Sequence, residues 1–573
     1  MAEQSSYLRH LPAVLWSDRQ DDPGYFLGQA LRIFEKVLSG IPDDVQVMHT
    51  AERDGQPRPH VHRGIAEQID GLSDLFDPWK APVDFLPWLA SWVDLRFPAL
   101  QGELLWDEYQ RRKVTAEIAT TYRMRGLRAG LNRYLRLYSA GRIQPRVAID
   151  DGARLLVAAP RADRRTDVCA LLAAGPQLDA QSEIVTDGIY RPTCLALDAA
   201  GGLFVGDTGG PFAGGFVDHR VWQVDAAGRY DVAPSPPGVG PRPVAATLRT
   251  AGGGGFRPDK EIAAVAFAPE TAARPDTLYV LDRAGSLFAI ANPAPDATTR
   301  PLNLPASGTP VAPVAMCLDR DGSLLVLDRG STSGTARPAV LVVAPDPLTV
   351  TAHPLQQVVE PLSMMVAGDG ALLVGDAGKQ RPPTPTSPGN LVRVDRANPA
   401  QWREAVLLPA DPAVNGLVAP SGIAPGADSS HVYVVDIGLR PFSPLGSNAP
   451  YIVTVAQPAA VFRVDLPAGP AASPGATVTN VTEPGGLVYP TGMVRQAGRL
   501  VICDPGYPVA QGETDSGIRA TPFRFEVIIH FRESELPDTN ERRAVRRRIN
   551  GDILAIVDEQ KPAHTWRVPR IGS

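Results

Sequence analysis

The spacing of hydrophobic and polar positions changes twice along the chain and divides it into three segments. From residue 1 to about 140, apolar residues recur at helical spacing. Tyr25–Ile41 carries them at intervals of three and four residues, which predicts a helix with one apolar stripe. Glu108–Met124 predicts a longer helix, which Gly126 ends, and Leu127–Leu137 predicts another. The first segment is therefore expected to be helical.

From about residue 165 to 508 the pattern becomes one of short apolar strands and turns, and one unit recurs. Arg191–Asp198 followed by Gly202–Asp207 returns as Val314–Asp319 followed by Gly322–Asp328. Six copies of the unit end in an aspartate: Asp207, Asp282, Asp328, Asp376, Asp436 and Asp504. Asp282 and Asp328 are 46 residues apart, and Asp328 and Asp376 are 48 apart. Such a period with two apolar strands per unit is typical of propeller blades and favours six blades over seven.

Each unit is followed by a candidate third strand. These candidates are Arg220–Val224, Ser286–Ile290, Val340–Val343, Leu391–Asp395 and Val461–Asp465. Too few residues follow Asp504 to supply the outer strands of the last unit. We expect Val168–Ala173 and Glu183–Thr186 to supply them, which would close the ring by joining its two ends. The closest copies of the repeat, Pro420–Ala424 and Pro490–Val494, resemble NHL repeats.

The third segment begins near Thr521 and is predicted to return to the first domain. Phe523–Phe531 alternates apolar and polar residues, which predicts a half-buried strand that could pair with Arg146–Ile149. A helix carrying Val545, Ile549 and Leu554 and a final strand at Thr565–Ile571 complete a strand–helix–strand unit. The predicted fold is multidomain α+β. Its expected domains are 1–150 and 520–573, forming one discontinuous domain, and 165–510, an inserted all-β propeller.

Composition narrows the classes of protein. With 44% hydrophobic and 21% charged residues the chain is expected to be soluble and globular, and 57 prolines fit many short strands and turns. A net charge of -6 gives no general attraction to nucleic acid or an anionic membrane. We expect no secretory signal, because the first residues lack a basic and an apolar region, and no membrane span. Four cysteines without CxxC spacing are expected to be reduced, in keeping with assembly in the cytoplasm.

The two flanking segments resemble the phage tail-like protein family of contractile tails and extracellular contractile injection systems. The resemblance covers about residues 5–150 and 520–570. The matching runs are Tyr7–Trp16, Phe34–Glu35, Leu75–Pro78, Phe85–Trp92, Tyr122–Leu137 and Glu559–Thr565. The chain departs from the family at Gly126-Leu127-Arg128, where Gly-Thr is common, and in carrying a propeller, which is not general to the family.

The resemblance implies a structural baseplate subunit that is part of a phage tail-like particle. Implied partners are other baseplate wedge subunits, with sheath and tube or hub proteins as further candidates, while the propeller would bind an unidentified protein or glycan. Candidate assembly-interface residues are Trp88, Trp92, Arg123, Arg125, Arg128, Lys561 and His564. The arginines near Arg123 have two interpretations, a solvated helical face or a contact with an acidic partner subunit.

The case for an enzyme rests on the six aspartates. Lactonase-like propellers hold calcium with carboxylates in the central channel, since hard oxygen ligands suit that cation. Each aspartate here directly follows an apolar strand, however, which is where side-chain capping of a turn is expected. Standard motifs of hydrolases, nucleotide-binding proteins and zinc proteases are absent, and His60 and His62 lack a nearby carboxylate. We therefore predict a non-enzyme without cofactor or metal. A calcium-dependent lactonase or esterase and a glycan-binding adhesin are the alternatives.

Overall fold

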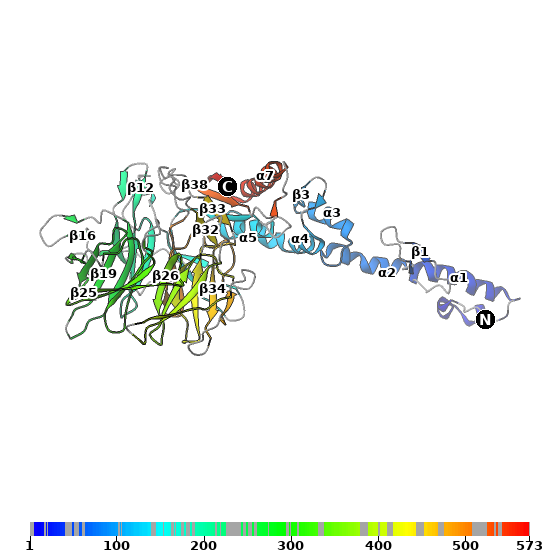
Figure 1. The fold of residues 1–573 in the computed structure, drawn as a ribbon. Helices are drawn as coiled ribbons and strands as arrows, with labels where there is room; N and C mark the ends of the chain where they lie inside the picture. Colours follow the sequence, from blue (N-terminus) through cyan, green and yellow to red (C-terminus); the bar gives the residue numbers. More distant parts are fainter. Residues whose placement is uncertain are drawn as a thin grey trace. The chain divides into compact units, whose positions relative to one another are not determined.

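The computed structural model describes two compact units, Met1–Thr120 and Thr121–Ser573 (Figure 1). It describes residues 5–571 with gaps, and the gaps of six or more residues are 40–47, 51–56, 139–144, 225–241, 331–336, 379–387, 410–415, 443–451, 468–474 and 507–523. Shorter gaps lie between other elements. None of the described helices is both long and apolar enough to cross a membrane.

Unit 1 is mainly helical, as the spacing of its apolar residues predicts. Its helices are η1 (Ser6–His10), η2 (Ala13–Leu15), α1 (Pro23–Ser39), α2 (Ile65–Asp70), η3 (Gly71–Phe76), η4 (Val83–Phe85), α3 (Leu86–Ser91) and most of α4 (Glu108–Tyr122). Two short hairpins join β1 (Met48–Thr50) to β2 (Pro57–Pro59) and β3 (Ala99–Leu100) to β4 (Glu103–Leu104). Pro87 in the first turn of α3 suits a helix start, because proline lacks the N–H that would be unpaired there.

Helix α1 buries its polar side and exposes its apolar stripe. The Glu35 carboxylate is buried and accepts hydrogen bonds from the Ser5 hydroxyl at 2.5 Å and from the Ser6 N–H at 2.9 Å. On the other side the predicted stripe is present, but Phe26 is 65% and Ile33 66% exposed. The segment around η1 therefore covers the polar side of α1 and leaves an apolar face open.

In unit 2, a three-stranded sheet joins the two ends of the unit. Its strand order is β39 (Trp566–Ile571), β38 (Arg524–His530) and β5 (Arg146–Asp150). β38 pairs antiparallel with β5, which confirms the predicted pairing of these two strands, and it also pairs parallel with β39. Helices α5 (Arg128–Tyr138) and α7 (Arg542–Gln560) contact each other, and Figure 1 draws them in cyan and red because they lie far apart in sequence.

The prediction that β38 is half-buried is wrong. Residues 525–530 are all buried, including Glu526 and His530. Ile528 packs with Ala148 of β5 and with Val488, which belongs to a loop of the propeller, so this face of the strand is covered by a second layer. Alternation in the sequence could not reveal this, because the covering residues come from a distant part of the chain.

Six four-stranded sheets make up most of the described part of unit 2. Sheet 1 contains β10 (Pro192–Leu197), β11 (Leu203–Asp207), β14 (Arg220–Val224) and β15 (Arg242–Val244). Sheet 2 contains β18 (Ile262–Ala268), β19 (Thr277–Asp282), β20 (Leu287–Ala291) and β21 (Thr299–Leu302). Sheet 3 contains β22 (Pro313–Leu318), β23 (Leu324–Asp328), β24 (Ala339–Pro345) and β25 (Leu348–Pro354).

The remaining three sheets follow the same order, except that the sixth combines both ends of the segment. Sheet 4 contains β26 (Pro361–Val366), β27 (Leu372–Asp376), β28 (Asn390–Asp395) and β29 (Arg403–Val406). Sheet 5 contains β30 (Pro420–Pro425), β31 (His431–Asp436), β34 (Ala460–Asp465) and β35 (Thr477–Asn480). Sheet 6 contains β36 (Gly492–Gln496), β37 (Arg499–Asp504), β6 (Arg154–Ala158) and β7 (Val168–Ala173). The predicted third strands are confirmed in sheets 1 to 5.

The first strands of the sheets contact one another in a cycle, β10 to β18, β22, β26, β30, β36 and back to β10. Side-chain hydroxyls join several neighbours. Thr491 donates to the Thr193 carbonyl at 2.9 Å, Ser421 to Pro490 at 2.7 Å and Ser363 to Pro420 at 2.8 Å. Radially arranged four-stranded sheets in cyclic contact form a β-propeller.

Strands from both ends of the propeller segment complete sheet 6, as predicted, but one of the two predicted strands is wrong. Val168–Ala173 is the outermost strand, β7. The third strand is β6, in which Val157 pairs with Val501, and not Glu183–Thr186. Within that stretch, β9 (Ile184–Val185) pairs instead with β8 (Gln177–Leu178). The strand at Arg154–Ala158 was not predicted to belong to the propeller, because it directly follows β5 of the first domain in the sequence.

Further hairpins, not members of the six sheets, connect second and third strands. β12 (Gly210–Phe212) pairs with β13 (Gly215–Val217) between β11 and β14, and β32 (Leu439–Phe442) pairs with β33 (Ile452–Val455) between β31 and β34. A third hairpin joins β16 (Leu248–Arg249) to β17 (Gly255–Phe256) between sheets 1 and 2.

The six repeat aspartates, called here the ring aspartates, end the second strands and cap the backbone. Asp436 is typical: it accepts the N–H groups of Val418 and Ala419 at 2.8 Å and of Gly438 at 2.7 Å. Asp207, Asp328, Asp376 and Asp504 make the same kind of contacts, while Asp282 accepts from its own turn. Each ring aspartate thus fixes a turn, and Asp207, Asp328, Asp376, Asp436 and Asp504 also fix the segment leading into the first strand.

Replacing Asp436 with alanine should lower the free energy of unfolding by at least about 3 kcal/mol, because it leaves three backbone N–H groups without their acceptor. Chemical denaturation of the full-length chain would measure the loss. Glu270→Ala is the matched control, since Glu270 is an exposed carboxylate, and should change stability by less than about 0.5 kcal/mol. Equal effects of the two substitutions would refute the capping role.

Candidate functional site

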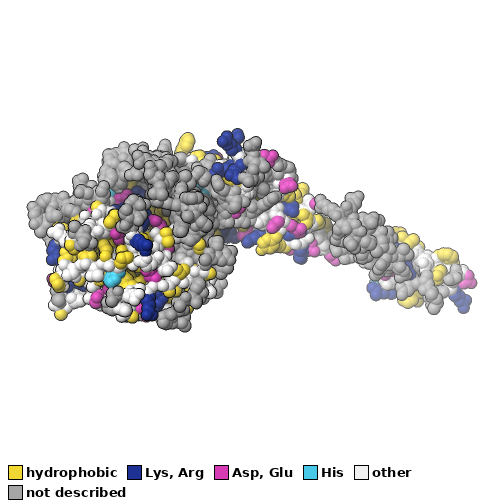
Figure 2. All heavy atoms as spheres, in the orientation of Figure 1, with side chains coloured by type: hydrophobic (Ala, Val, Ile, Leu, Met, Phe, Trp, Pro, Cys, Tyr) yellow, Lys and Arg dark blue, Asp and Glu magenta, His cyan; other side chains and the backbone are white. Residues whose placement is uncertain are grey.

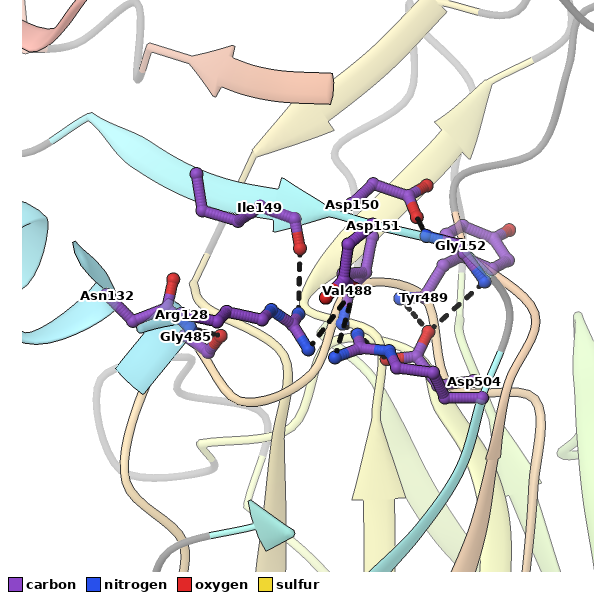
Figure 3. A network of polar contacts seen from close by, with 12 residues as sticks. Arg128, Asn132, Ile149, Asp150, Asp151, Gly152, Gly485, Val488, Tyr489 and Asp504 are labelled. Atoms are coloured by element: carbon purple, nitrogen blue, oxygen red, sulfur yellow. Dashed lines mark hydrogen bonds and ion pairs between the residues drawn. The ribbon is translucent and has the colours of Figure 1, made fainter. Parts of the chain in front are cut away.

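The chain passes from the three-stranded sheet into the propeller within four residues. β5 ends at Asp150 and β6 begins at Arg154. Gly152 lies between them with a φ of 116°, a conformation that strongly favours glycine, and donates its N–H to the Asp150 carboxylate at 3.0 Å. So short a connection leaves the sheet and the propeller little freedom to move apart, and their contacts are shown in Figure 3.

A buried ion pair lies beneath this connection. Arg154 is 6% exposed and Asp504, the last ring aspartate, is fully buried, with 3.3 Å between Nη2 and Oδ2. Arg154 also contacts Asp151 at 3.4 Å. Burial raises the pKa of Asp504, while the N–H groups of Tyr489 and Val488 oppose that rise. Asp504 therefore combines a ring aspartate's capping role with a contact to the strand that enters the propeller.

Three polar residues on one face of α5 contact the propeller or the connection to it. Arg128, Asn132 and Arg136 are four residues apart, so they lie on the same side of the helix. Asn132 donates to the Gly485 carbonyl at 2.8 Å, and Arg136 forms an ion pair with Glu483. The side chain of Arg128 donates to the Ile149 carbonyl at 2.7 Å and lies 3.5 Å from the Asp151 carboxylate.

Residues 483–489 form the propeller loop that contacts α5, and this loop allows the helix to pack closely against it. Gly485 has a φ of 86°, and a Cβ at this position would lie 3.4 Å from Cβ of Asn132. Val488 is buried against Ala148 and Ile528, and its carbonyl accepts a hydrogen bond from Arg146 at 3.0 Å. Hydrogen bonds, an apolar contact and ion pairs thus all hold this loop. We call α5, the β5–β6 connection and residues 483–489 the mounting site.

Hydrogen bonds join the turn before α5 to the end of α7. The N–H of Gly126 donates to the Gln560 carbonyl at 2.9 Å, and Arg125 donates to the Glu559 carbonyl at 2.6 Å. Lys561 donates to the Thr565 carbonyl at 2.8 Å. These bonds tie the turn before α5 to the end of α7, so the two ends of unit 2 form one layer.

The seven interface candidates therefore fall into three groups. Arg125 and Lys561 make internal backbone contacts, and Arg128 belongs to the mounting site. Arg123 and His564 are exposed in unit 2. Trp88 and Trp92 lie in unit 1, and nothing described in either unit assigns any of the seven an intermolecular partner.

Trp88 and Trp92 form an exposed aromatic cluster with neighbouring rings. The two indole rings lie 4.5 Å apart, with Phe85 4.4 Å from Trp88 and Phe76 5.6 Å from Trp92. Trp92 is 60% and Trp88 44% exposed, whereas Trp106 is buried. We call Phe76, Phe85, Trp88 and Trp92 the aromatic patch. Contiguous exposed rings of this kind mark interaction surfaces.

Sequence analysis missed most of the mounting site. Asn132 and Arg136 stand four and eight residues after Arg128, a spacing that was available as a signal. The partners on the propeller, Glu483 and Gly485, carry no pattern of their own, since they lie in a loop. His60 and His62 lie outside the described residues, and within the described ones no group of three or more His, Cys, Asp or Glu side chains is placed to hold a metal ion.

Comparison with known proteins finds a family model that matches one part of the chain. Residues 58–149 match the model of a phage tail protein family, Tail_P2_I. The predicted resemblance to phage tail proteins is thereby confirmed for a segment that includes the aromatic patch and α5. No curated protein sequence matches the chain.

The solved structures that resemble the chain include a β-propeller domain and enzymes, and their sequence identity to this chain is low. Virginiamycin B lyase from Staphylococcus aureus is 10% identical, with 63% of this chain and 99% of the lyase covered and a TM-score of 0.34. The Cps50 β-propeller domain from Myceliophthora thermophila is 12% identical (61% and 96% covered, TM-score 0.32). An aldose sugar dehydrogenase from Streptomyces coelicolor is also 12% identical (55% and 95% covered, TM-score 0.32). The resemblance to NHL repeats stays a prediction.

Replacing Arg154 with glutamine should lower the free energy of unfolding by about 3–5 kcal/mol, because the Asp504 carboxylate stays buried without its cation. Arg136→Gln is the matched control: its ion pair with Glu483 is about one-third exposed, so the loss should be about 1 kcal/mol or less. Chemical denaturation followed by circular dichroism would compare the two. Similar losses would show that the buried pair does not hold the mounting site.

Proposed function

We propose that the chain is a structural, non-enzymatic baseplate subunit of a phage tail-like contractile injection system. In this proposal, segments 1–150 and 520–573 form a discontinuous tail-protein domain that docks to other subunits. A six-bladed propeller is inserted between them and presented as an interaction surface. The partners would be other baseplate wedge subunits, with sheath and tube or hub proteins as further candidates.

The observation that carries the proposal is the tail-family match over residues 58–149. The same stretch holds the aromatic patch, whose rings a stable monomer would be expected to bury. It also holds α5, whose polar face contacts the propeller. One family segment therefore contains both an exposed apolar surface suited to a partner and the helix that supports the propeller.

The apolar face of α1 supports docking independently. Phe26, Ile33, Phe34, Val37 and Leu38 are all exposed on this helix. Figure 2 shows hydrophobic side chains at the surface of the N-terminal part of unit 1, which contains α1. A helix whose apolar stripe faces water gains stability only when another element covers that stripe. In a particle that element would be a neighbouring subunit.

The ring aspartates favour a structural propeller over a calcium-dependent lactonase. Their carboxylate oxygens accept backbone N–H groups, as at Asp328 and Asp376, so these oxygens are directed into the protein's own turns. A calcium site would need several carboxylate and carbonyl oxygens turned toward one point. Calcium titration of the full-length chain, followed by a lactone hydrolysis assay, separates the two functions.

Replacing both Trp88 and Trp92 with alanine should abolish incorporation of the subunit into particles while leaving the isolated chain folded. The two rings are exposed, so their loss removes little of the core but much of the proposed contact surface. The measurement is the subunit content of purified particles, by immunoblot and electron microscopy. Val311→Ala, an exposed apolar residue of the propeller, is the control and should incorporate normally. Normal incorporation of the double variant would contradict docking through the aromatic patch.

Expressed alone, the full-length chain should self-associate, because the α1 stripe and the aromatic patch are exposed. Replacing Phe26, Ile33 and Val37 with serine should shift it toward monomer, as measured by light scattering after size exclusion. Serine substitutions at the exposed Arg543, Glu103 and Glu270 are a matched polar control and should leave association unchanged. A wild-type chain that stays monomeric at high concentration would count against the proposed role.

A further inference from the structure

The propeller is built from repeats, so equivalent positions at different contacts between neighbouring sheets can be compared. We call each contact between two neighbouring sheets a seam. Asp198 lies nine residues before the ring aspartate Asp207, and Asp319 lies nine residues before Asp328. Both follow the first strand of their sheet, at the start of the turn into the second. Asp198 and Asp319 therefore occupy the same position in sheets 1 and 3.

At the seam between sheets 3 and 4, this aspartate binds a guanidinium group. Arg396, which directly follows β28, contacts both oxygens of the Asp319 carboxylate, with 2.9 Å from Nη2 to Oδ1. It also donates to the Gly370 carbonyl at 2.7 Å and lies 5.8 Å from the ring of Trp402. The hydrogen bond from Arg396 lowers the pKa of Asp319, so the carboxylate stays ionised.

The seam between sheets 1 and 2 lacks this cation. Asn292 follows β20 as Arg396 follows β28, because Ile290 pairs with Leu278 as Val394 pairs with Leu372. Asp276 takes the position of Gly370, six residues before the ring aspartate. At the seam between sheets 1 and 2, the short neutral side chain of Asn292 therefore takes the place of Arg396. The carboxylate of Asp276 is present in addition to that of Asp198.

A cavity of about 440 Å³ occupies this position. Its described lining includes Asp198, Phe204, Gln223, Phe267, Asp276 and Asn292, and no lysine or arginine is among the lining residues that the structure describes. One oxygen of each carboxylate is bound within the chain, by the Gly202 N–H at 2.6 Å and the Glu270 N–H at 2.7 Å. For the second oxygens, the described part of the chain shows no donor.

The cavity lies at the end of the strands opposite the mounting site. In sheet 1 the turn 198–202 joins the ends of β10 and β11 that lie away from Asp207. In sheet 6, Asp504 stands at the end of β37 that corresponds to Asp207, and it accepts N–H groups from Val488 and Tyr489 of the mounting site. A group entering this cavity therefore approaches the face of the propeller that the three-stranded sheet and α5 leave uncovered.

The geometry points to a binding site for a guanidinium group, supplied by an arginine side chain of another protein. Two carboxylates without a cation favour a positive ligand, and a planar guanidinium can bind a carboxylate with two parallel hydrogen bonds, as Arg396 does with Asp319. The rings of Phe204 and Phe267, stacked 5.6 Å apart, form an apolar wall, and the more exposed Phe267 could contact a cation through its face. The inference rests on the proposed function in taking the propeller as an interaction surface, and names the chemistry of its partner.

The test is a ligand-observed NMR titration of the full-length chain with N-acetyl-arginine amide. N-acetyl-citrulline amide is the matched neutral probe, because it keeps the shape and replaces the guanidinium with a urea group. The arginine probe should bind at least about tenfold more tightly, equivalent to about 1.4 kcal/mol. N-acetyl-lysine amide should be weaker than the arginine probe. Equal binding of citrulline or of lysine would overturn the assignment.

Three variants locate the site. Asp276→Asn and Asp198→Asn should each weaken the arginine probe at least about tenfold, since each removes a charge that faces the ligand. Asn292→Arg should also block it by placing a guanidinium of the chain's own in the cavity. Asn292 has a φ of 47°, which is unfavourable for arginine, so binding and not stability is the readout.

Asp319→Asn is the control, because it breaks the corresponding pair at the other seam and should leave probe binding unchanged. Circular dichroism establishes that each variant is folded. If Asp198→Asn unfolds the chain, Asp276→Asn and Asn292→Arg still decide the question. Undiminished binding by those two variants refutes the site. Because the purified chain is titrated alone, this result is separable from failure of the subunit to enter particles.

Discussion

Unit 2 depends on one pairing, that of β37 with β6. Ile502 lies opposite Leu156 in these strands, so residues more than three hundred positions apart complete one sheet. The pairing closes the cycle of first strands and, because β6 directly follows β5, it brings the propeller against the three-stranded sheet. The Arg154–Asp504 ion pair lies at this point. Loss of the pairing would open the propeller and detach it from its support at once.

In the mounting site, polar contacts fix the orientation of the propeller relative to α5, which apolar burial alone would not specify. Val488, Ala148 and Ile528 provide a small dry contact. Around it, Asn132 and Arg136 specify which loop is bound and in what register. Hydrogen bonds of this kind add little net stability each, but an alternative docking would leave them unmade, and a buried unsatisfied group is costly. The propeller is consequently held in one orientation with respect to α5.

The sequence alone predicted individual strands and helices better than it predicted which segments pair with them or cover them. Five third strands and the pairing of β38 with β5 were predicted from apolar spacing, and the six ring aspartates mark the ends of second strands in the structure. The error at Glu183–Thr186 has a different origin: an apolar pair such as Ile184–Val185 is equally suited to several neighbours, and only ring closure selects Arg154–Ala158. The burial of both faces of β38 was likewise set by Val488, a loop residue with no periodic signal. The exposure of the α1 stripe could not be predicted either, since spacing defines an apolar face but not what covers it.

Sheet 6 also constrains how the protein is made. β6 and β7 leave the ribosome early and can pair with each other, but the other edge of β6 has no partner until β37 has been synthesised, about 350 residues later (Arg154 to Asp504). At common elongation rates that interval is on the order of tens of seconds. During it the apolar strands Arg154–Ala158 and Val168–Ala173 present unpaired edges, which are prone to aggregate. Closing so long a loop is also entropically slow. The chain therefore gains from protection while it is being translated, because sheet 6 can be completed only after β37 has been synthesised.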